Sequence, residues 1–534
     1  MVTTERQFGI LSPILGDRED IPCILLDKAY SPESSNVFMR WGELHRIRGR
    51  LKELLDGNND QVRTPDTNPI IKYHRHLTKA PVTEYLFAFT KANAYIWDSV
   101  NKEWDLMFTC SQDCTEWSVE SVDAAGGNYK KVIATNGIDL IQVWSDQTPG
   151  TAFAPFDTES GLDLGGGSSL TAAKYVTVYE QYVIFAYTTE GGVVYPNRIR
   201  WCSHTDETDY DETGTGDTGA ADLDKGKGHL KGFGKYGPFL IVFKTHSVRR
   251  MWLTEDDYVF NNDEELPNVG LLATDSVVND VEGRLYWVDN NYNIRELRSG
   301  VISAAKDKTL KQINYTYQDY ITATLIDEYQ LLCWSIPYGD GATGNNKILT
   351  YQPENRIWGV FDFAVRAFGD YSRQTAYTID TIPFDTINTI GWPTIDTVEN
   401  IVGFPLDLVS DYSGYSWSLH QALTDCGSSF TGSLVITTDL SDKTSLSQYK
   451  RINGMHLYFR SEGAGEAIIE AKEDNELNWQ SLKTIDLTSE ESQQIICVYL
   501  PCDLRARHFL LRVSASNSFR FLGVIFDYEL DGMR

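Results

Sequence analysis

Two similar hairpin segments constrain the fold of this chain most strongly. Ile348–Phe363 and Ala94–Phe108 each alternate apolar and polar residues, pass through a short polar turn, and then resume the alternation. In both segments an aromatic residue precedes the turn and a tryptophan follows it at the same offset: Tyr351 and Trp358, and Trp97 and Trp104. That offset places two large rings on one face of a hairpin, where both can pack against the next sheet.

Weaker relatives of this hairpin occupy much of the intervening chain. They lie at Gly137–Trp144, Asn197–Trp201, Phe239–Leu253 and Gly283–Leu297. Recurrent hairpins that cannot bury both faces alone are typical of a radial array of small sheets. We therefore predict an all-β chain whose middle part is a β-propeller of six to eight blades, with seven as the central expectation. The repeats lack a strict WD or Gly-Gly motif, so an ordinary multi-sheet β-sandwich stays open as the alternative.

The spacing of the strands divides the chain into three parts. Residues 1–65 do not follow the hairpin pattern, residues 66–428 do, and residues 429–534 contain about six evenly spaced strands. We predict an N-terminal arm, a propeller with inserted loops, and a C-terminal antiparallel β-sandwich. A length of 534 residues allows this division, because a propeller absorbs roughly 350 residues as one unit.

The N-terminal arm contains a stretch, Phe38–Leu55, in which basic residues are interleaved with apolar ones. A partly helical arm that docks on a neighbouring protein is one interpretation, and a solvated charged face is the other. The interaction candidates of this stretch are Arg40, Arg46, Arg48, Arg50 and Lys52.

A second interaction candidate is the low-complexity stretch Gln374–Asn400, which repeats Thr-Ile and Asp-Thr. Its many β-branched residues predict an extended hairpin or loop that protrudes from the ring and seeks a partner edge. The apolar residues that would make this contact are Ile379, Ile382, Ile387 and Ile390.

The charge balance restricts the class of partner. A formal net charge of −28 argues against a protein that clamps nucleic acid, because binding phosphates requires a basic face. It fits a soluble particle, or a surface past which a polyanion moves without binding. The first ten residues lack the features of a secretory signal, and no run approaches about 18 apolar residues, so we predict no membrane-spanning segment.

Three groups of residues raise the question of a metal. Cys110 and Cys114 have the spacing of a metal knuckle, but no second Cys or His pair follows, so reduced buried thiols are the favoured state for the eight cysteines. His74 and His76 would share one face of a strand, which leaves a metal pair open. Thr205–Gly228 is acidic and glycine-containing but lacks the EF-hand pattern, so a solvated loop is favoured over calcium. Its calcium candidates are Asp211, Asp217, Asp222 and Asp224.

The sequence contains no recognisable catalytic motif. A Gly-x-Ser-x-Gly elbow, a His-Glu-x-x-His motif and a Walker loop are all absent. Carboxylates are so common in this chain that no glycosidase pair can be selected from the sequence. We therefore predict that the chain is not an enzyme and holds no cofactor.

A succession of strand and turn motifs covers residues 190–300 and 345–534. The motifs include Arg198-Ile-Arg-Trp-Cys-Ser, Thr245-His-Ser-Val-Arg-Arg-Met-Trp252, Pro267-Asn-Val-Gly270, Gly283-Arg-Leu-Tyr-Trp-Val-Asp289, Asp411-Tyr-Ser-Gly-Tyr415 and Tyr449-Lys-Arg-Ile452. This succession resembles the blade series of tail proteins of tailed bacteriophages, together with the sandwich that follows it.

The resemblance implies a structural component of the virion, namely the nozzle or hub at the distal end of a short tail. In such a tail, six copies form a ring around the DNA channel, adjoin a tail adaptor protein, and hold fibres or spikes for host attachment. DNA would pass during ejection without specific binding. The protein would be assembled in the host cytoplasm and located in the virion tail.

Two other functions stay open beside this one. A glycan-binding propeller that recognises a host surface would expose tryptophan and tyrosine side chains in its loops. A propeller glycosidase would need carboxylates or arginines that converge in the central pocket.

Overall fold

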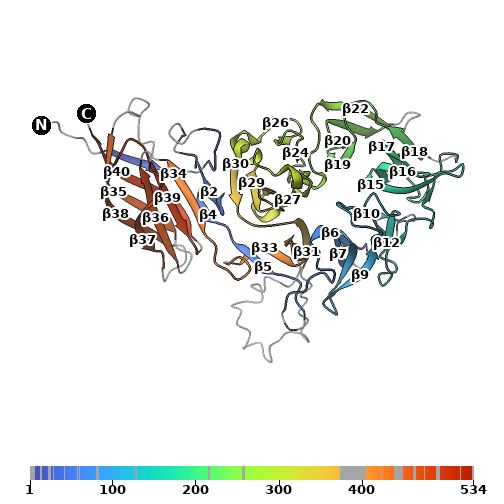
Figure 1. The fold of residues 1–534 in the computed structure, drawn as a ribbon, viewed down its shortest axis with the longest axis horizontal. Helices are drawn as coiled ribbons and strands as arrows, with labels where there is room; N and C mark the ends of the chain where they lie inside the picture. The colour runs from blue at the N-terminus through green and yellow to red at the C-terminus, as the bar shows by residue number, and fades with distance from the viewer. Residues whose placement is uncertain are drawn as a thin grey trace.

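The computed structural model describes most of the chain. The described residues are 7–11, 15–21, 26–27, 29–40, 43–56, 58, 60–79, 83–124, 127, 129–214, 217–254, 259–372, 405–422, 424–437, 449–460, 465–473, 476–488, 494–517 and 519–531. Within them, β-strands form nine sheets (Figure 1). Helical structure in the described residues is confined to short segments: η2 (Thr274–Ser276), η3 (Ser303–Lys306), α1 (Asp307–Leu310), η4 (Tyr315–Tyr320) and η5 (Asp327–Tyr329). The prediction of an all-β, propeller-like chain is confirmed at this level.

Seven of the nine sheets follow one another along the chain and surround a common centre (Figure 1). The first three consist of β6 (Ile70–Leu77), β7 (Glu84–Thr90), β8 (Asn93–Asp98) and β9 (Glu103–Thr109); β10 (Ser118–Asp123), β11 (Lys130–Thr135), β12 (Gln142–Ser145) and β13 (Ala154–Pro155); and β14 (Leu162–Asp163), β15 (Ser169–Tyr179), β16 (Tyr182–Glu190), β17 (Val193–Trp201) and β18 (Gly219–Asp222).

The next three sheets have four strands each. They consist of β19 (Leu230–Tyr236), β20 (Phe239–Lys244), β21 (Ser247–Leu253) and β22 (Phe260–Pro267); β23 (Val278–Asn279), β24 (Leu285–Val288), β25 (Ile294–Glu296) and β26 (Gly300–Val301); and β27 (Thr322–Ile326), β28 (Leu331–Ile336), β29 (Lys347–Gln352) and β30 (Ile357–Phe361). Consecutive sheets touch through their inner strands, except that β19 of the fourth sheet contacts β24 of the fifth, and the last inner strand of the series, β31, returns to contact β6.

The last sheet of the series contains a strand from the start of the chain. Its strands are β31 (Ala367–Ser372), β32 (Pro405–Ser410), β33 (Ser416–Ala422) and β5 (Gly49–Lys52). β5 pairs antiparallel with β33, so that Lys52 lies opposite Trp417. A segment preceding the first sheet therefore completes the last one, which ties the two ends of the series together.

The remaining two sheets combine both ends of the chain. One contains β1 (Gln7–Leu11), β3 (Val37–Arg40), β4 (Glu43–Arg46), β35 (Tyr449–Arg460), β38 (Ile495–Ala506) and β40 (Arg520–Asp531), and the other contains β2 (Ser34–Ser35), β34 (Gly432–Thr437), β36 (Glu466–Glu473), β37 (Gln480–Asp486) and β39 (Phe509–Ala515). Side chains from both sheets form one buried apolar cluster. The six predicted strands after residue 429 are present, and the polar strand β37 is an additional one.

The expectation of a partly helical N-terminal arm is wrong, because Phe38–Leu55 forms strands β3, β4 and β5. Two of its basic residues make contacts within the chain. The Arg46 guanidinium donates to the Phe430 carbonyl and lies 3.9 Å from the centre of the Phe430 ring. Arg50 forms an ion pair with Asp425 at 2.7 Å. The other candidates lie in β3 (Arg40), between β4 and β5 (Arg48, exposed), and in β5 (Lys52, exposed).

The two aromatic hairpins form as the sequence predicts. Trp97 of β8 lies opposite Trp104 of β9 with ring centres 5.3 Å apart, and Tyr351 of β29 lies opposite Trp358 of β30 at 4.6 Å. The first pair is buried against Tyr371 and other residues of the last sheet, and the second lies in the cluster shared by the fifth and sixth sheets. Each hairpin therefore buries its rings against a neighbouring sheet.

Four further predictions concern the acidic loop, the repeat at 374–400, the cysteines and membrane-spanning segments. Part of the predicted acidic loop, residues 219–222, is strand β18. The repeat at 374–400, with Ile379, Ile382, Ile387 and Ile390, lies outside the described residues. Seven cysteines in the described part are free thiols, of which three are buried and Cys497 is exposed. In the same part of the chain no helix is long and apolar enough to cross a membrane.

Candidate functional site

A cavity of about 570 Å³ lies where the seven sheets meet. Residues of β6, β10, β15, β19, β23, β27 and β31 line it, together with η2. Each of the seven sheets contributes its inner strand, and alternate residues of such a strand face the same side. The cavity therefore collects side chains from positions between residues 71 and 370 that no single sequence motif connects.

An ion pair joins two distant sheets within this lining. The Lys72 ammonium of β6 lies 2.6 Å from the Asp275 carboxylate in η2, and both side chains are partly buried. Burial alone would lower the pKa of Lys72, but the attraction of Asp275, supported by Glu120, more than offsets burial and raises that pKa. Lys72 therefore stays charged over the physiological range and holds Asp275 at a fixed place.

Glu120 of β10 is the second carboxylate close to Lys72. Burial raises the pKa of Glu120 above that of an ordinary glutamate, although Lys235 and Lys72 act in the opposite direction. Lys72 thus contacts the Asp275 carboxylate directly. It also interacts electrostatically with Glu120, for which burial favours the protonated form. Carboxylates with such different environments are suited to separate acid and base roles.

Hydrogen bonds fix a further carboxylate beside the cavity. The hydroxyl of Tyr175 donates to one oxygen of Glu116 at 3.1 Å, and the hydroxyl of Thr274 donates to the other at 3.0 Å. Tyr175 and Thr274 both line the cavity. Since both oxygens of Glu116 are engaged, this residue supports the wall of the cavity and joins the third sheet to η2.

Two carboxylates face each other in the last sheet. Asp370 of β31 lines the cavity and lies directly opposite Asp407 of β32. Burial, followed by the repulsion of Asp370, raises the pKa of Asp407 to about 7. Burial also raises the pKa of Asp370, against the effect of Arg75. Asp370 therefore adds to the cavity an acidic group whose pKa burial raises, and Asp407 lies beside it on the next strand.

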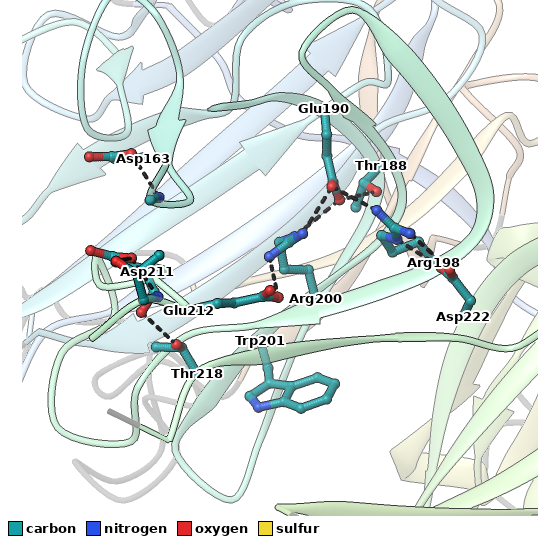
Figure 2. Close-up of polar contacts among 12 residues, drawn as sticks. Asp163, Thr188, Glu190, Arg198, Arg200, Trp201, Asp211, Glu212, Thr218 and Asp222 are labelled. Atoms are coloured by element: carbon teal, nitrogen blue, oxygen red, sulfur yellow. Dashed lines mark hydrogen bonds and ion pairs between the residues drawn. The ribbon is translucent and has the colours of Figure 1, made fainter. Parts of the chain in front are cut away.

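The calcium candidates do not converge on a metal site. Figure 2 shows Asp222 directed at Arg198, which it binds through two hydrogen bonds of 2.7 and 2.8 Å. Asp211 accepts from the backbone and hydroxyl of Thr213. Asp217 accepts hydrogen bonds from Tyr182, Ser203 and His204, and Asp224 accepts one from Asn197.

An ion-pair network accounts for much of the charge in this region. Glu190 at the end of β16 binds both Arg198 and Arg200 of β17, and Arg200 also binds Glu212 at 2.7 Å (Figure 2). Arginines and hydroxyl groups thus satisfy the carboxylates that would otherwise attract a cation. In the described part of the chain, no group of three or more His, Cys, Asp or Glu residues has the geometry to hold a metal ion.

The side chains of the two paired motifs noted in the sequence contact other groups of the chain or each other. His74 and His76 do share one face of β6, as predicted, but both contact the hydroxyl of Ser121 at 2.8 Å. The Cys110 and Cys114 side chains interact with each other, and that contact lowers the pKa of Cys110. No further ligand-type side chain completes either pair among the described residues.

Comparisons with known proteins give similarity in solved structures alone. No protein-family model matches the chain, and no curated protein matches it. One matched structure is a glycoside hydrolase with 10% identity, covering 88% of this chain and 99% of that chain at a TM-score of 0.27. A glycoside hydrolase family 43 arabinoxylan arabinofuranohydrolase from Bacillus subtilis, in complex with cellotetraose, has 9% identity, coverage of 94% and 96%, and a TM-score of 0.24. The dihydro-heme d1 dehydrogenase NirN has 8% identity, coverage of 73% and 74%, and a TM-score of 0.34.

These findings correct the functional prediction. Two of the matched structures are glycoside hydrolases, which does not agree with the predicted tail nozzle or with the expectation of a protein without enzymatic activity. The physical reason lies in the cavity, where Glu120, Asp275 and Asp370 converge although no spacing in the sequence joins them. At such low TM-scores the comparisons identify no catalytic residue. The location in a virion tail and the sixfold ring stay predictions, because no described feature bears on them.

None of the charged residues that line the cavity stands out in the sequence. Lys72 and Glu120 lie on two different sheets, Asp275 lies in η2, and all three are ordinary members of a chain rich in charged residues. One signal was available, since the three residues lie in or beside strands upstream of predicted hairpins, namely those at Ala94–Phe108, Gly137–Trp144 and Gly283–Leu297. In a radial array these strands line the centre, so their polar residues are the ones to compare.

Proposed function

We propose that the central cavity is a glycoside-hydrolysing site in which Glu120 and Asp275 are the two working carboxylates. The observation that carries this proposal is the contrast between them around Lys72. Burial raises the pKa of Glu120, which favours a proton on it, whereas Asp275 is held in a 2.6 Å ion pair. Hydrolysis of a glycosidic bond requires one protonated and one ionised carboxylate on either side of that bond.

The roles follow from these environments. Glu120 donates its proton to the glycosidic oxygen as the bond from that oxygen to the anomeric carbon breaks. Asp275 stabilises the positive charge that develops on the sugar ring and accepts a proton from the water that adds to the anomeric carbon. Lys72 holds Asp275 in place through their ion pair, and the volume of about 570 Å³ lies in the range of small-molecule sites.

We further propose that the seven sheets are the blades of a seven-bladed propeller, and that the other two sheets form a β-sandwich. Two observations support the blade number: seven inner strands line one cavity, and β31 contacts β6. The pairing of β5 with β33 supplies the closing strand. The buried cluster shared by the two other sheets supports the sandwich.

Hydrolysis of nitrophenyl glycosides tests the function. A panel that covers several sugars and both anomers is incubated with the full-length protein and with the variants Glu120→Gln and Asp275→Asn. Each variant should lose about 10²–10⁴-fold in kcat, because each removes an acid or a base from the reaction. Glu103→Gln is the matched control, since Glu103 is exposed on β9, away from the cavity. Full activity in Glu120→Gln, or no hydrolysis of any glycoside by the unaltered protein, would refute the proposal.

A glycan-binding cavity without hydrolysis is the second candidate. Aromatic side chains in the lining, namely Trp117, Tyr175, Phe233 and Phe368, favour it because sugar rings stack on such groups. Calorimetry with oligosaccharides separates the two candidates. Saturable binding with no reducing sugar released would support the binding function alone.

A further inference from the structure

A chain of four polar residues lies between the first and second sheets. His74 Nε2 and His76 Nδ1 each lie 2.8 Å from the Ser121 hydroxyl, and His76 Nε2 lies 3.5 Å from Asp146 Oδ2. His76 is completely buried, the Asp146 side chain is 4% exposed, and Ser121 is partly exposed. The glycosidase proposal uses none of these four residues.

The protons in this chain have one consistent arrangement. A carboxylate accepts hydrogen bonds, so His76 Nε2 carries the proton directed at Asp146. Burial lowers the pKa of His76, so the ring is neutral near pH 7 and its Nδ1 is an acceptor. The Ser121 hydroxyl therefore donates to His76 Nδ1.

His74 completes this arrangement on the side of the central cavity, which it lines. Burial lowers the pKa of His74 to about 3, so this ring is neutral as well. Because the Ser121 proton is directed at His76, His74 Nε2 must donate to the Ser121 oxygen. A serine oxygen has two lone pairs, so one of them is left available for attack on an electrophile.

The surrounding residues hold the His76 ring in place. The Trp144 ring contacts His76 edge-on, with ring centres 5.5 Å apart, and Tyr85 lies on another side at 6.5 Å. The backbone N–H of Lys130 donates to Asp146 Oδ1 at 3.0 Å. Both the base and the carboxylate that orients it are thus fixed before any substrate arrives.

We propose that Ser121, His76 and Asp146 form a nucleophilic triad that acts on small carboxylic esters reaching Ser121 from the side of His74. The Ser121 oxygen attacks the acyl carbon while its proton moves to His76 Nδ1. His76 then gives this proton to the departing alcohol oxygen, which leaves an acylated Ser121. Water, deprotonated by His76 in the same way, releases the acid and restores the serine. His74 is a positioning residue, because it acts only through the Ser121 hydroxyl.

A fluorophosphonate probe tests the triad on the full-length protein. The Ser121 oxygen would displace fluoride from phosphorus, which leaves a stable adduct that intact mass and peptide mapping detect. We expect one adduct, on the peptide that contains Ser121, and none in Ser121→Ala. Asp146→Asn should slow labelling by about 10²–10⁴-fold, because His76 would lose its orientation. Hydrolysis of nitrophenyl acetate should fall in the same variants.

The matched control is Ser118→Ala, which removes another hydroxyl of β10 that bonds the Val176 carbonyl at 3.2 Å. This variant should be labelled at the unaltered rate. An unlabelled wild-type protein, or an adduct that maps to another residue, would overturn the proposal. So would a labelling rate that is unchanged in a folded Asp146→Asn protein, with folding checked by circular dichroism.

Discussion

The outer and inner strands of the same sheets differ in how far apart in the sequence their contacting residues lie. In the first sheet, the outer strands β8 and β9 place Trp97 against Trp104, two residues of one hairpin. The inner strand β6 places Lys72 against Asp275, which belongs to a distant part of the chain. The outer pair is therefore specified by local alternation, whereas the inner pair exists only once the seven sheets are arranged around one centre. The outer pair mainly stabilises the fold, and the inner one mainly sets the chemistry of the cavity.

Removing an outer ring should have the largest effect on stability. Trp104 is 4% exposed and packs in the cluster between the first and last sheets. Trp104→Ala should lower the free energy of unfolding by about 3–5 kcal/mol, because it leaves a large cavity in that cluster. Urea denaturation measures the loss. Trp252→Ala on β21 is the control and should cost clearly less, since Trp252 is only partly buried. Equal losses of stability would show that the buried Trp104 ring stabilises the fold no more than the partly buried Trp252 ring does.

The closing strand depends on a close approach that only glycine permits. A Cβ at Gly49 would clash with the backbone carbonyl of Thr424. Gly49→Ala should therefore destabilise the protein by about 1–3 kcal/mol, because backbone atoms must move. Thermal unfolding measures the effect, and Gly341→Ala is the control, because Gly341 has open space around it and no positive φ. If the two variants were equally stable, the pairing of β5 with β33 would be looser than described.

The carboxylate pair of the last sheet should make stability depend on pH. Burial raises the pKa of Asp407 to about 7, so between about pH 4 and pH 7 the folded state holds a proton that the unfolded chain releases. Stability should therefore fall as pH rises through this window. Asp407→Asn should raise the free energy of unfolding by on the order of 1–2 kcal/mol at pH 8 and leave it almost unchanged at pH 4.

Urea titrations at both pH values measure this difference. Asp370, Asp327 and Glu328 also repel the Asp407 charge, so each is left intact. Asp105→Asn, at an exposed position on β9, should show no such pH dependence. A gain in stability that is the same at pH 4 and pH 8 would contradict the shifted pKa.

The inner ion pair should contribute least to stability. Lys72→Met should cost only about 0.5–1 kcal/mol, because the lysine side chain is 33% exposed and solvent screens the pair. Its effect on the cavity should be larger, since Glu120 and Asp275 would lose their shared cation. A double-mutant cycle with Asp275→Asn measures the coupling. If Lys72→Met lowered the free energy of unfolding as much as Trp104→Ala, the inner pair would stabilise the fold as much as the outer pair does, contrary to the comparison above.

The parts of the fold that could be predicted are those that depend on the pattern of residues close together in the sequence. The Tyr351 and Trp358 offset specified a hairpin, and the strands after residue 429 followed from their alternation. Strand β37 was missed because its sequence, Gln-Ser-Leu-Lys-Thr-Ile-Asp, is mostly exposed and polar. The prediction for Phe38–Leu55 was wrong because its basic residues were expected to contact a neighbouring protein or solvent, whereas Arg46 and Arg50 bind groups of the same chain more than 370 positions away.

The candidate site could not be predicted for the same reason. Glu120 is one of 75 acidic residues, and nothing beside it in the sequence distinguishes it. Its environment comes from Lys72 and Lys235 on other sheets. His74 and His76 were noted for their spacing and placed on one face correctly. Their shared partner, Ser121, comes from the next sheet, so sequence spacing suggested a metal where the fold supplies a hydroxyl group.

The pairing of early strands with late ones has a consequence for protein synthesis. On the ribosome, β5 emerges long before β33, and β1 emerges before β40, with which it pairs residue for residue from Gln7 to Leu11. The early strands must therefore wait, with their edges unpaired, until nearly the whole chain has been translated. Unpaired edges recruit other chains. The nascent protein should accordingly be most prone to aggregation just before translation ends, and slowing translation should lengthen that exposed period.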